Sequence, residues 1–473
     1  MTKSHNHLAL FGLCLGATLF AACTDTTAPA PTSTGATAPP IAAGAVRGDI
    51  VGTKLFTLPK TTVVGPRDAM SRAVPMGEPL TAPKETVATH SKQGILRLAP
   101  GAGLSELKIP ITSASGAKVI VGSLVQGRDE KIAALHELTL ASPSGLRVEP
   151  KVVTSAPSEG GKTFEMLKTP MHTGVWELDE SHGRGEFSLK LSPTLQASGA
   201  TVVVFEPSST LDMSVLAVHP IVAAGDTGVV RVTLMDGATP ITGATLDAHL
   251  STPTKQDGPA VTMREIGGGV YEGTVTDALT EKDKSDAYTL NVNATGTTGS
   301  ARFVRTGATA FTYVVPTGRI TSIGTPRVVR DAGGKVTAFE ADFSIEASSS
   351  DRFEVNAFLT TTGADGLEHP VAEAQTAENF DAGMHTLTLS FDAGYPQIAA
   401  VAGELHLRKV TLFSQGQQIL LQRDEEGFKT AFPVVKLAEL KPLAVIPPGL
   451  QMMIDKKTGG LRVGPPPRPV VAH

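Results

Sequence analysis

The feature that most restricts how this sequence can fold is a recurring alternation of apolar and polar residues over short stretches. In the stretch 286–296, DAYTLNVNATG, Tyr288, Leu290, Val292 and Ala294 fall on one face of an extended chain and polar residues fall on the other. The chain also carries 48 glycines and 33 prolines, which suit frequent turns between short strands. The sequence therefore predicts an all-β protein built from antiparallel sandwiches.

Three local patterns make this prediction specific. The run Gly267-Gly268-Gly269 supplies the positive-φ positions of a hairpin turn between strands at 263–266 and 270–275. Alternate residues from Phe339 to Ile345 are apolar, which predicts a strand with one buried face. Leu405, Leu407 and Val410 alternate as well, with one slip in the register.

Composition divides the chain into three folded modules between two irregular ends. We expect β-sandwiches at 91–211, 212–316 and 317–440, because about 100–150 residues make one domain. The segment 23–90 begins as a Pro-, Thr- and Ala-rich linker, and 441–473 is a Pro-rich tail; we expect both to be disordered. The joints near residues 212 and 316 carry no residues that reveal the angle between modules.

The N-terminus has the layout of an export signal. One lysine and two histidines precede the apolar run LALFGLCLGATLFAAC, which is too short to span a membrane as a helix. Residues 20–23, Phe-Ala-Ala-Cys, resemble the bacterial lipobox, and this resemblance implies cleavage of residues 1–22 and lipidation of Cys23. Thr24 after that cysteine implies sorting to the outer membrane. The alternative is an ordinary secretory signal with an incidental cysteine.

Cysteine usage agrees with a lipid anchor. The sequence has two cysteines, and Cys14 lies inside the segment that would be removed. Cys23 is then the one cysteine left in the mature chain, so the modules must be stabilised by burial rather than by disulfides.

Each module resembles domains of exported bacterial proteins. The central module, with its turn, its triple-glycine hairpin and a strand carrying Asp286 and Tyr288, resembles bacterial immunoglobulin-like domains and their tyrosine corner. In the first module, LTLASPSG followed by GVWEL and GEFSLKL resembles jelly-roll accessory domains of secreted proteases. In the third, GMHTLTLSF resembles the C-terminal sandwiches of exported proteins. The first and third modules are either immunoglobulin-like or jelly-roll in topology. As a whole, the chain resembles a bacterial envelope family of unknown function.

The sequence contains none of the common catalytic signatures. G-x-S-x-G, H-E-x-x-H, the P-loop and the dinucleotide-binding glycine pattern are all missing. We therefore expect no enzyme activity, no catalytic residues, no metal and no cofactor. A formal charge of −5 also gives no basic surface for nucleic acid.

One polar cluster remains as a candidate site. The stretch 176–186 contains Glu177, Asp179, Glu180 and His182, which could hold a hard cation or act as an acid–base pair. Alternation favours another interpretation, in which the acidic residues lie on the solvent face of a strand and 181–185 forms a hairpin turn.

These observations together predict a lipid-anchored protein of the bacterial cell envelope, facing either the periplasm or the outside of the cell. We expect a non-catalytic binding, adhesion or scaffold role, with envelope or extracellular proteins as partners besides the membrane. A carbohydrate-binding module that recognises glycans is one alternative. A hydrolase or metal-dependent accessory protein that uses the 176–186 cluster is another.

Overall fold

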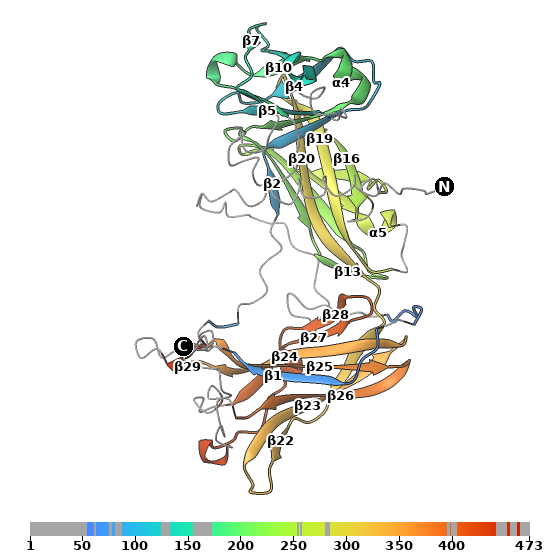
Figure 1. Ribbon diagram of the computed structural model, residues 1–473, viewed down its shortest axis with the longest axis vertical. Helices are drawn as coiled ribbons and strands as arrows, with labels where there is room; N and C mark the ends of the chain where they lie inside the picture. Colours follow the sequence, from blue (N-terminus) through green and yellow to red (C-terminus); the bar gives the residue numbers. More distant parts are fainter. Residues whose placement is uncertain are drawn as a thin grey trace, which may run out of the picture.

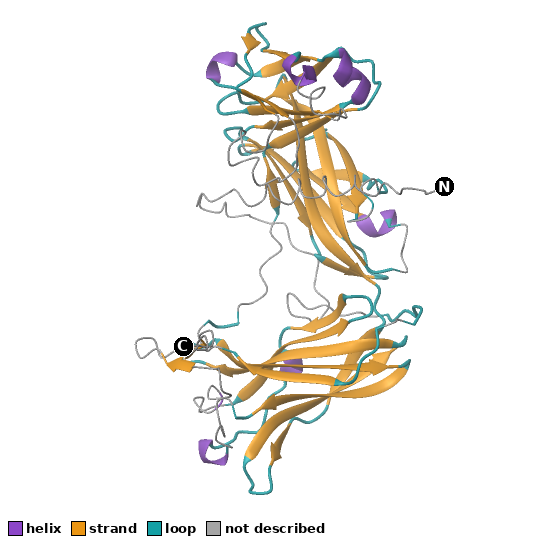
Figure 2. Ribbon diagram, viewed as in Figure 1, coloured by secondary structure: helices purple, strands orange, loops and turns teal. Residues whose placement is uncertain are grey.

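The computed structural model describes residues 54–60, 63–74, 78–80, 88–123, 133–154, 173–252, 255, 258–279, 284–394, 398 and 404–440, together with a short strand pair near the C-terminus. Strands dominate these residues, with only a few short helical turns (Figure 2). Six sheets pack in pairs around three separate apolar cores, so the protein is nearly all-β, as the sequence predicts. Within the described ranges, no helix is long and apolar enough to cross a membrane.

The first sandwich encloses a core that contains Trp176, Phe187 and Ile109. One sheet follows the order β3-β11-β5-β9-β8 and the other follows β4-β10-β6-β7. Their bounds are β3 Gln93–Leu98, β4 Glu106–Ile111, β5 Lys118–Ser123, β6 Thr139–Ala141, β7 Arg147–Val148, β8 Val152–Thr154, β9 Thr173–Glu177, β10 Gly185–Lys190 and β11 Ala200–Phe205, with the 3-10 turn η2 Glu180–His182 and the helix α4 Pro193–Ser198.

The central sandwich contains the longest strand pair of this half of the molecule, β19 with β20. Its two sheets follow the orders β17-β18-β14-β12-β2 and β13-β20-β19-β16, with β15 paired to β14. Their bounds are β2 Thr89–Ser91, β12 Leu211–Ala217, β13 Ile221–Ala223, β14 Val229–Asp236, β15 Thr239–Pro240, β16 Thr245–Ser251, β17 Met263–Gly267, β18 Val270–Thr274, β19 Asp286–Thr298 and β20 Ala301–Val314, with the short helix α5 Val275–Ala278.

The third sandwich pairs a sheet of order β1-β25-β24-β27-β28 with a second sheet in which β23 lies between β26 and the strands β21 and β22. Their bounds are β1 Asp68–Ala73, β21 Gly318–Ile323, β22 Arg327–Arg330, β23 Val336–Ala347, β24 Asp351–Thr362, β25 Glu368–Phe380, β26 Gly383–Asp392, β27 Leu405–Ser414 and β28 Ile419–Asp424, followed by the turns η3 Gly427–Lys429 and η4 Leu437–Glu439. The C-terminal strand pair is β29 Met452–Ile454 with β30 Leu461–Val463.

The local sequence patterns are confirmed. The alternate apolar residues of β19, from Tyr288 to Ala294, are buried. β17 and β18 form the expected hairpin, in which Gly267, Gly268 and Gly269 all have positive φ. A Cβ on Gly269 would lie 2.6 Å from the carbonyl oxygen of Leu234, so only glycine fits at the end of the turn.

The slip between Leu407 and Val410 has a visible backbone cause. Lys409 adopts a φ of 49° between these two buried residues, and the pairing of β27 with β24 shifts register at the same place. The extra residue is a β-bulge, which turns Val410 back toward the core.

The main difference from the sequence analysis lies in the segment before the first sandwich. Residues 68–73, which the sequence analysis assigns to the linker, form β1 and pair antiparallel with β25 of the third sandwich. The segment then supplies β2 to the central sandwich and β3 to the first (Figure 1). We call residues 54–80 the strap; of its described residues, 54–60 contact the joint between the central and third sandwiches, and 63–74 and 78–80 contact the third sandwich.

Candidate binding sites

The predicted polar cluster at 176–186 does not converge on one point. Glu177 lies at the end of β9 and pairs with Lys151 and, at 3.4 Å, with Lys118. The ammonium group of Lys151 is the main reason why the pKa of Glu177 lies below its ordinary value. Glu177 is thus a paired carboxylate on a strand surface, as the alternation favours.

Asp179 and His182 form a cap on the turn η2, and Glu180 is exposed inside that turn. The Asp179 carboxylate accepts a hydrogen bond from the backbone amide of Ser181 at 2.9 Å, and Nδ1 of His182 lies 2.9 Å from Oδ1 of Asp179. The Ser181 hydroxyl lowers the pKa of Asp179 most strongly. This reciprocal arrangement is a capping box, which stabilises a local turn.

Within the described ranges, no group of three or more histidine, cysteine, aspartate or glutamate side chains is arranged to hold a metal ion. Cys23, the predicted lipidation site, and the signal segment 1–22 lie outside the described residues.

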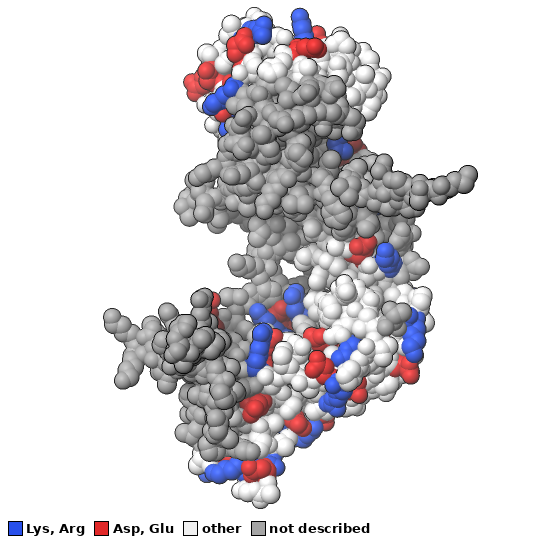
Figure 3. All heavy atoms as spheres, in the orientation of Figure 1, with Lys and Arg blue, Asp and Glu red and all other residues white. Residues whose placement is uncertain are grey.

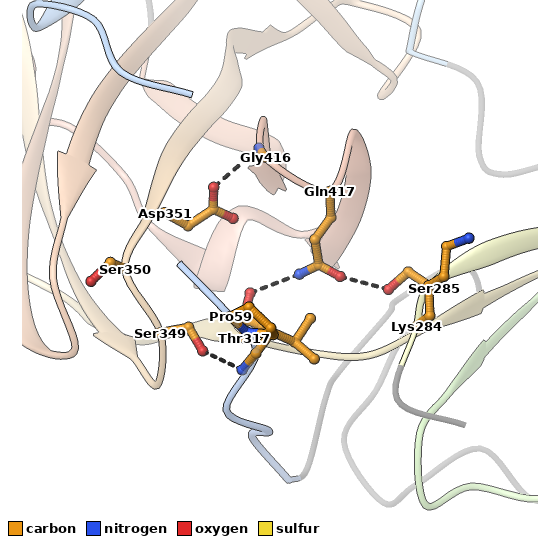
Figure 4. Close-up of a pocket in the computed structure, with 10 residues that line it drawn as sticks. Pro59, Lys284, Ser285, Thr317, Ser349, Ser350, Asp351, Gly416 and Gln417 are labelled. Atoms are coloured by element: carbon orange, nitrogen blue, oxygen red, sulfur yellow. Dashed lines mark hydrogen bonds between the residues drawn. The ribbon is translucent and has the colours of Figure 1, made fainter. Parts of the chain in front are cut away.

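A cavity of about 320 Å³ lies where the strap, the central sandwich and the third sandwich meet (Figure 4). Gln417 is one of the residues that line it: its side-chain oxygen accepts from the Ser285 hydroxyl at 2.7 Å and its amide donates to the Thr317 hydroxyl at 2.9 Å. The strap joins through Leu58, whose backbone amide donates to the Ser349 hydroxyl at 2.6 Å. These polar groups connect three chain segments by hydrogen bonds. We therefore interpret the cavity as part of the junction between the two sandwiches and the strap, rather than as a ligand site.

The third sandwich holds the strap as a receptor would hold an extended peptide. Arg352 is 7% exposed, and its Nη1 donates to the carbonyl oxygens of Gly65 at 3.0 Å and Pro66 at 2.7 Å. The side-chain amide of Asn379 also donates to the Gly65 carbonyl. Backbone pairing of β1 with β25 continues from Asp68 to Ala73. The contacts to residues 65–73 are therefore largely contacts to backbone groups, as in strand addition.

Side chains of the strap add contacts to β25 and β26. Ser71 faces β26, and its hydroxyl accepts from the backbone amide of Asp392 at 3.1 Å. On the solvent side, Nε of Arg72 donates to the Glu373 carboxylate at 2.6 Å. Nη2 of Arg67 donates to the Thr388 carbonyl of β26 at 3.3 Å. β1 thus contacts the edge strands of both sheets, and we call the edge of β25 that faces β1, together with the adjoining residues of β26, the strap groove.

A buried ionic cluster joins the first and central sandwiches. Arg305 of β20 and Glu206, just after β11, are both fully buried, with Nη1 and Oε2 2.6 Å apart. Glu206 also accepts from the backbone amides of Thr112 and Ser113, and Arg305 donates to the Ser209 hydroxyl at 2.9 Å. This cluster is a buried contact between the two sandwiches near residue 212, where the sequence analysis finds no residue that reveals the angle between modules. Nothing in the spacing of Arg305 and Glu206 along the chain, which is 99 residues, reveals the pair.

The surface charges elsewhere are mixed. On the face of the third sandwich shown in Figure 3, basic and acidic residues are interspersed, and no area of a single sign dominates. Several of these charges are paired across β22 and β23, where Arg327 contacts both Glu340 and Asp342. The pKa of Asp342 lies below its ordinary value, mainly because of its hydrogen bond to Arg327.

The sequence match to a known protein family lies in the third sandwich. Residues 324–430 match the C-terminal domain of the DUF4785 family, a domain of unknown function. The expected resemblance to a family of unknown function therefore holds for this segment. β1 lies outside the matched residues, so the matched segment receives an edge strand from a distant part of the sequence.

A similar overall fold occurs in a solved structure. The crystal structure of a DUF4785 family protein from Legionella pneumophila has 18% sequence identity and a TM-score of 0.58, and the match covers 79% of this chain and 100% of that one. At this identity the similarity concerns the fold alone. A mutant of Salmonella alpha-2-macroglobulin is 12% identical over 76% of this chain and 24% of its own, but its TM-score of 0.20 is too low to support an argument. No curated protein matches the chain.

Proposed function

We propose that this protein is a lipid-anchored, non-catalytic scaffold of the bacterial cell envelope that binds protein partners through strand edges. The observation that supports this best is the strap groove, in which Arg352, Asn379 and the edge of β25 already hold an extended segment. Strand addition of this kind recognises main-chain groups and therefore suits an extended protein segment as partner.

The position of the strap also suits a tether that begins at Cys23. About 30 residues separate Cys23 from residue 54, where the strap begins, and such a segment reaches at most about 100 Å when fully extended. Phe56 of the strap donates its backbone amide to the Pro316 carbonyl, between the central and third sandwiches. An anchor at Cys23 would thus hold the molecule at this joint, and the first sandwich would lie at the far end (Figure 1).

In the described residues Phe205, at 40% exposure, is the exposed aromatic side chain, and the tryptophan and the three described tyrosines give the carbohydrate alternative no binding platform. Trp176 is fully buried in the first core, and Tyr271, Tyr288 and Tyr313 are each less than 10% exposed. Stacking on a pyranose ring requires an exposed aromatic face, so these side chains instead support packing. Glu177 pairs with Lys151 and Lys118, and Asp179 and His182 cap the turn η2, so the cluster has a local structural role that does not require a hydrolase site.

Membrane fractionation tests the anchor. Replacing Cys23 with serine should move the protein from the membrane fraction to the soluble fraction, whereas Cys14→Ser should leave it in the membrane fraction. Equal distribution of the two variants would remove the anchor from the proposal. Protease treatment of intact cells, with permeabilised cells as reference, would then distinguish a surface position from a periplasmic one.

A screen for enzyme activity tests the proposed non-catalytic role. The purified full chain should turn over no substrate in panels of glycans, esters and peptides. Turnover that is abolished by Glu177→Gln or His182→Gln would contradict a non-catalytic role.

A further inference from the structure

The third sandwich does not need the strap for its core. Within the described ranges, no residue of 63–74 belongs to the buried core of this sandwich, and Asp68, Ala69 and Met70 are exposed. Phe56 and Leu58 lie earlier in the strap and are partly buried against the core of the central sandwich. The strap is therefore held mostly by backbone pairing and polar contacts at an edge, and its release would leave the packing of the third core intact.

The strap groove is nevertheless selective for this sequence. Register places Ala69 opposite Thr376, Ser71 opposite Ala374 and Ala73 opposite Ala372, so small residues face small residues on the inner side. Two basic residues of the strap pair with carboxylates of β25: Arg72, on the outer side, with Glu373, and Arg67, just before β1, with Glu378 at 3.8 Å. A segment that fits here in the same way needs small residues at alternate positions and a basic residue opposite Glu373.

The connection that follows the strap is long enough to let it reach a neighbouring molecule. Leu80 is the last strap residue bonded to the third sandwich, through its backbone amide and the Glu368 carbonyl at 2.7 Å. Eight residues, 81–88, separate it from β2, and a chain of that length spans about 28 Å at full extension.

We propose that the strap groove also accepts the strap of a second copy of this chain, so that two molecules exchange residues 54–80. This inference rests on the proposed function and names the partner of the same site. Every contact of the strap is identical within one chain and between two copies, so the connecting segment and the protein concentration decide between the two forms. Confinement to a membrane surface raises the local concentration and favours exchange.

Engineered cysteines distinguish the two forms. Met70 and Gln375 lie directly opposite each other in the pairing of β1 with β25, and directly opposite positions in such pairs are close enough for a disulfide. One full-length chain carries Met70→Cys and another carries Gln375→Cys, both with Cys14→Ser and Cys23→Ser. The two are mixed over a range of concentrations, once as folded proteins and once by refolding together, and are then oxidised.

Exchange predicts a disulfide-linked heterodimer whose yield rises with concentration. The matched control replaces Gln375→Cys by Thr321→Cys, an exposed position on β21, which lies on the side of β23 away from β26. We expect at least tenfold more heterodimer with Gln375→Cys than with the control. A chain carrying Met70→Cys and Gln375→Cys together should close within itself at low concentration, which verifies that both variants fold with β1 in place.

Two results would overturn the inference. One is a heterodimer yield no higher than that of the control at any concentration, in both the mixing and the refolding experiment, while the double variant still closes on itself. The other is crosslinking of Gln375→Cys to a different envelope protein in cells, with no heterodimer between copies. Neither result depends on Cys23, so the crosslinking experiment and the membrane fractionation experiment test the exchange and the anchor independently.

Discussion

The buried pair of Arg305 and Glu206 allows a quantitative test of how the first two sandwiches are joined. Glu206→Ala removes the carboxylate opposite Arg305 and leaves a fully buried guanidinium among the neutral groups of Thr112, Ser209 and the backbone. Removing one partner of a buried pair typically costs about 3–5 kcal/mol, because the remaining charge has no counter-ion. In a folded unit of about 225 residues, each kcal/mol shifts Tm by roughly 2–4 °C, so we expect a decrease of about 6–20 °C.

Differential scanning calorimetry of the full chain measures this effect and its location. We expect the transition that includes the first and central sandwiches to shift or to split in two, while that of the third sandwich stays in place. The control is Glu186→Ala, which breaks the 3.1 Å pair with Arg302 across the same joint, where both side chains are largely exposed. An exposed pair contributes about 0–1 kcal/mol, so the control should shift Tm by only a few degrees.

The double replacement Glu206→Leu with Arg305→Met tests whether the lost stability comes from the unpaired charge. If the cost of the single variant comes from an unpaired charge, removing both charges should restore much of the lost stability. Equal shifts for Glu206→Ala and Glu186→Ala would refute the reasoning, because burial would then make no difference to the pair.

Three further predictions concern single side chains. Arg352→Ala should increase hydrogen exchange in β1 without melting the third sandwich, whereas Arg72→Ala, which breaks a more exposed pair, should do so less. The hydrogen bond to Asp212 raises the pKa of His90, so this contact stabilises the docking of β2 fully below pH of about 6.5 and is lost as pH rises through the raised pKa. The protection of the β2 amides against hydrogen exchange should therefore be higher at pH 5.5 than at pH 8. In the variant His90→Gln this difference in protection should disappear. Trp176→Ala should destabilise the first sandwich by about 3–5 kcal/mol in denaturant titrations, and native Trp176 fluorescence should resist iodide quenching and stay unchanged when glycans are added.

The sequence predicts strands well where one face of the strand is buried. β19 and β23 each place an apolar residue at every second position, and the structure buries those residues. The bulge at Lys409 is visible as a slip in the same pattern. Burial of a face leaves a periodic signal because it selects residue type at alternate positions.

The strap leaves no such signal. β1 has the sequence DAMSRA, and it is held by backbone groups and by polar contacts at a sheet edge. An edge strand that contributes nothing to a core needs no apolar alternation, so its sequence looks like that of a linker. The contacts that could reveal it, such as Arg352 with Pro66, join residues 286 positions apart. A separation of 99 positions likewise hides the Arg305–Glu206 pair.

The strap also sets an order of events in folding. β1 is synthesised first but pairs with β25, about 300 residues later, so the strap cannot dock until the third sandwich has formed. Until then, β25 presents an unpaired edge with small residues on its inner side, which any extended segment of suitable pattern can pair with. The edge is therefore open during folding and closed afterwards by the chain itself. Selection for a strap that binds tightly enough to protect this edge would by itself produce a groove specific for residues 65–74. Exchange between copies would follow from that specificity without any additional contact.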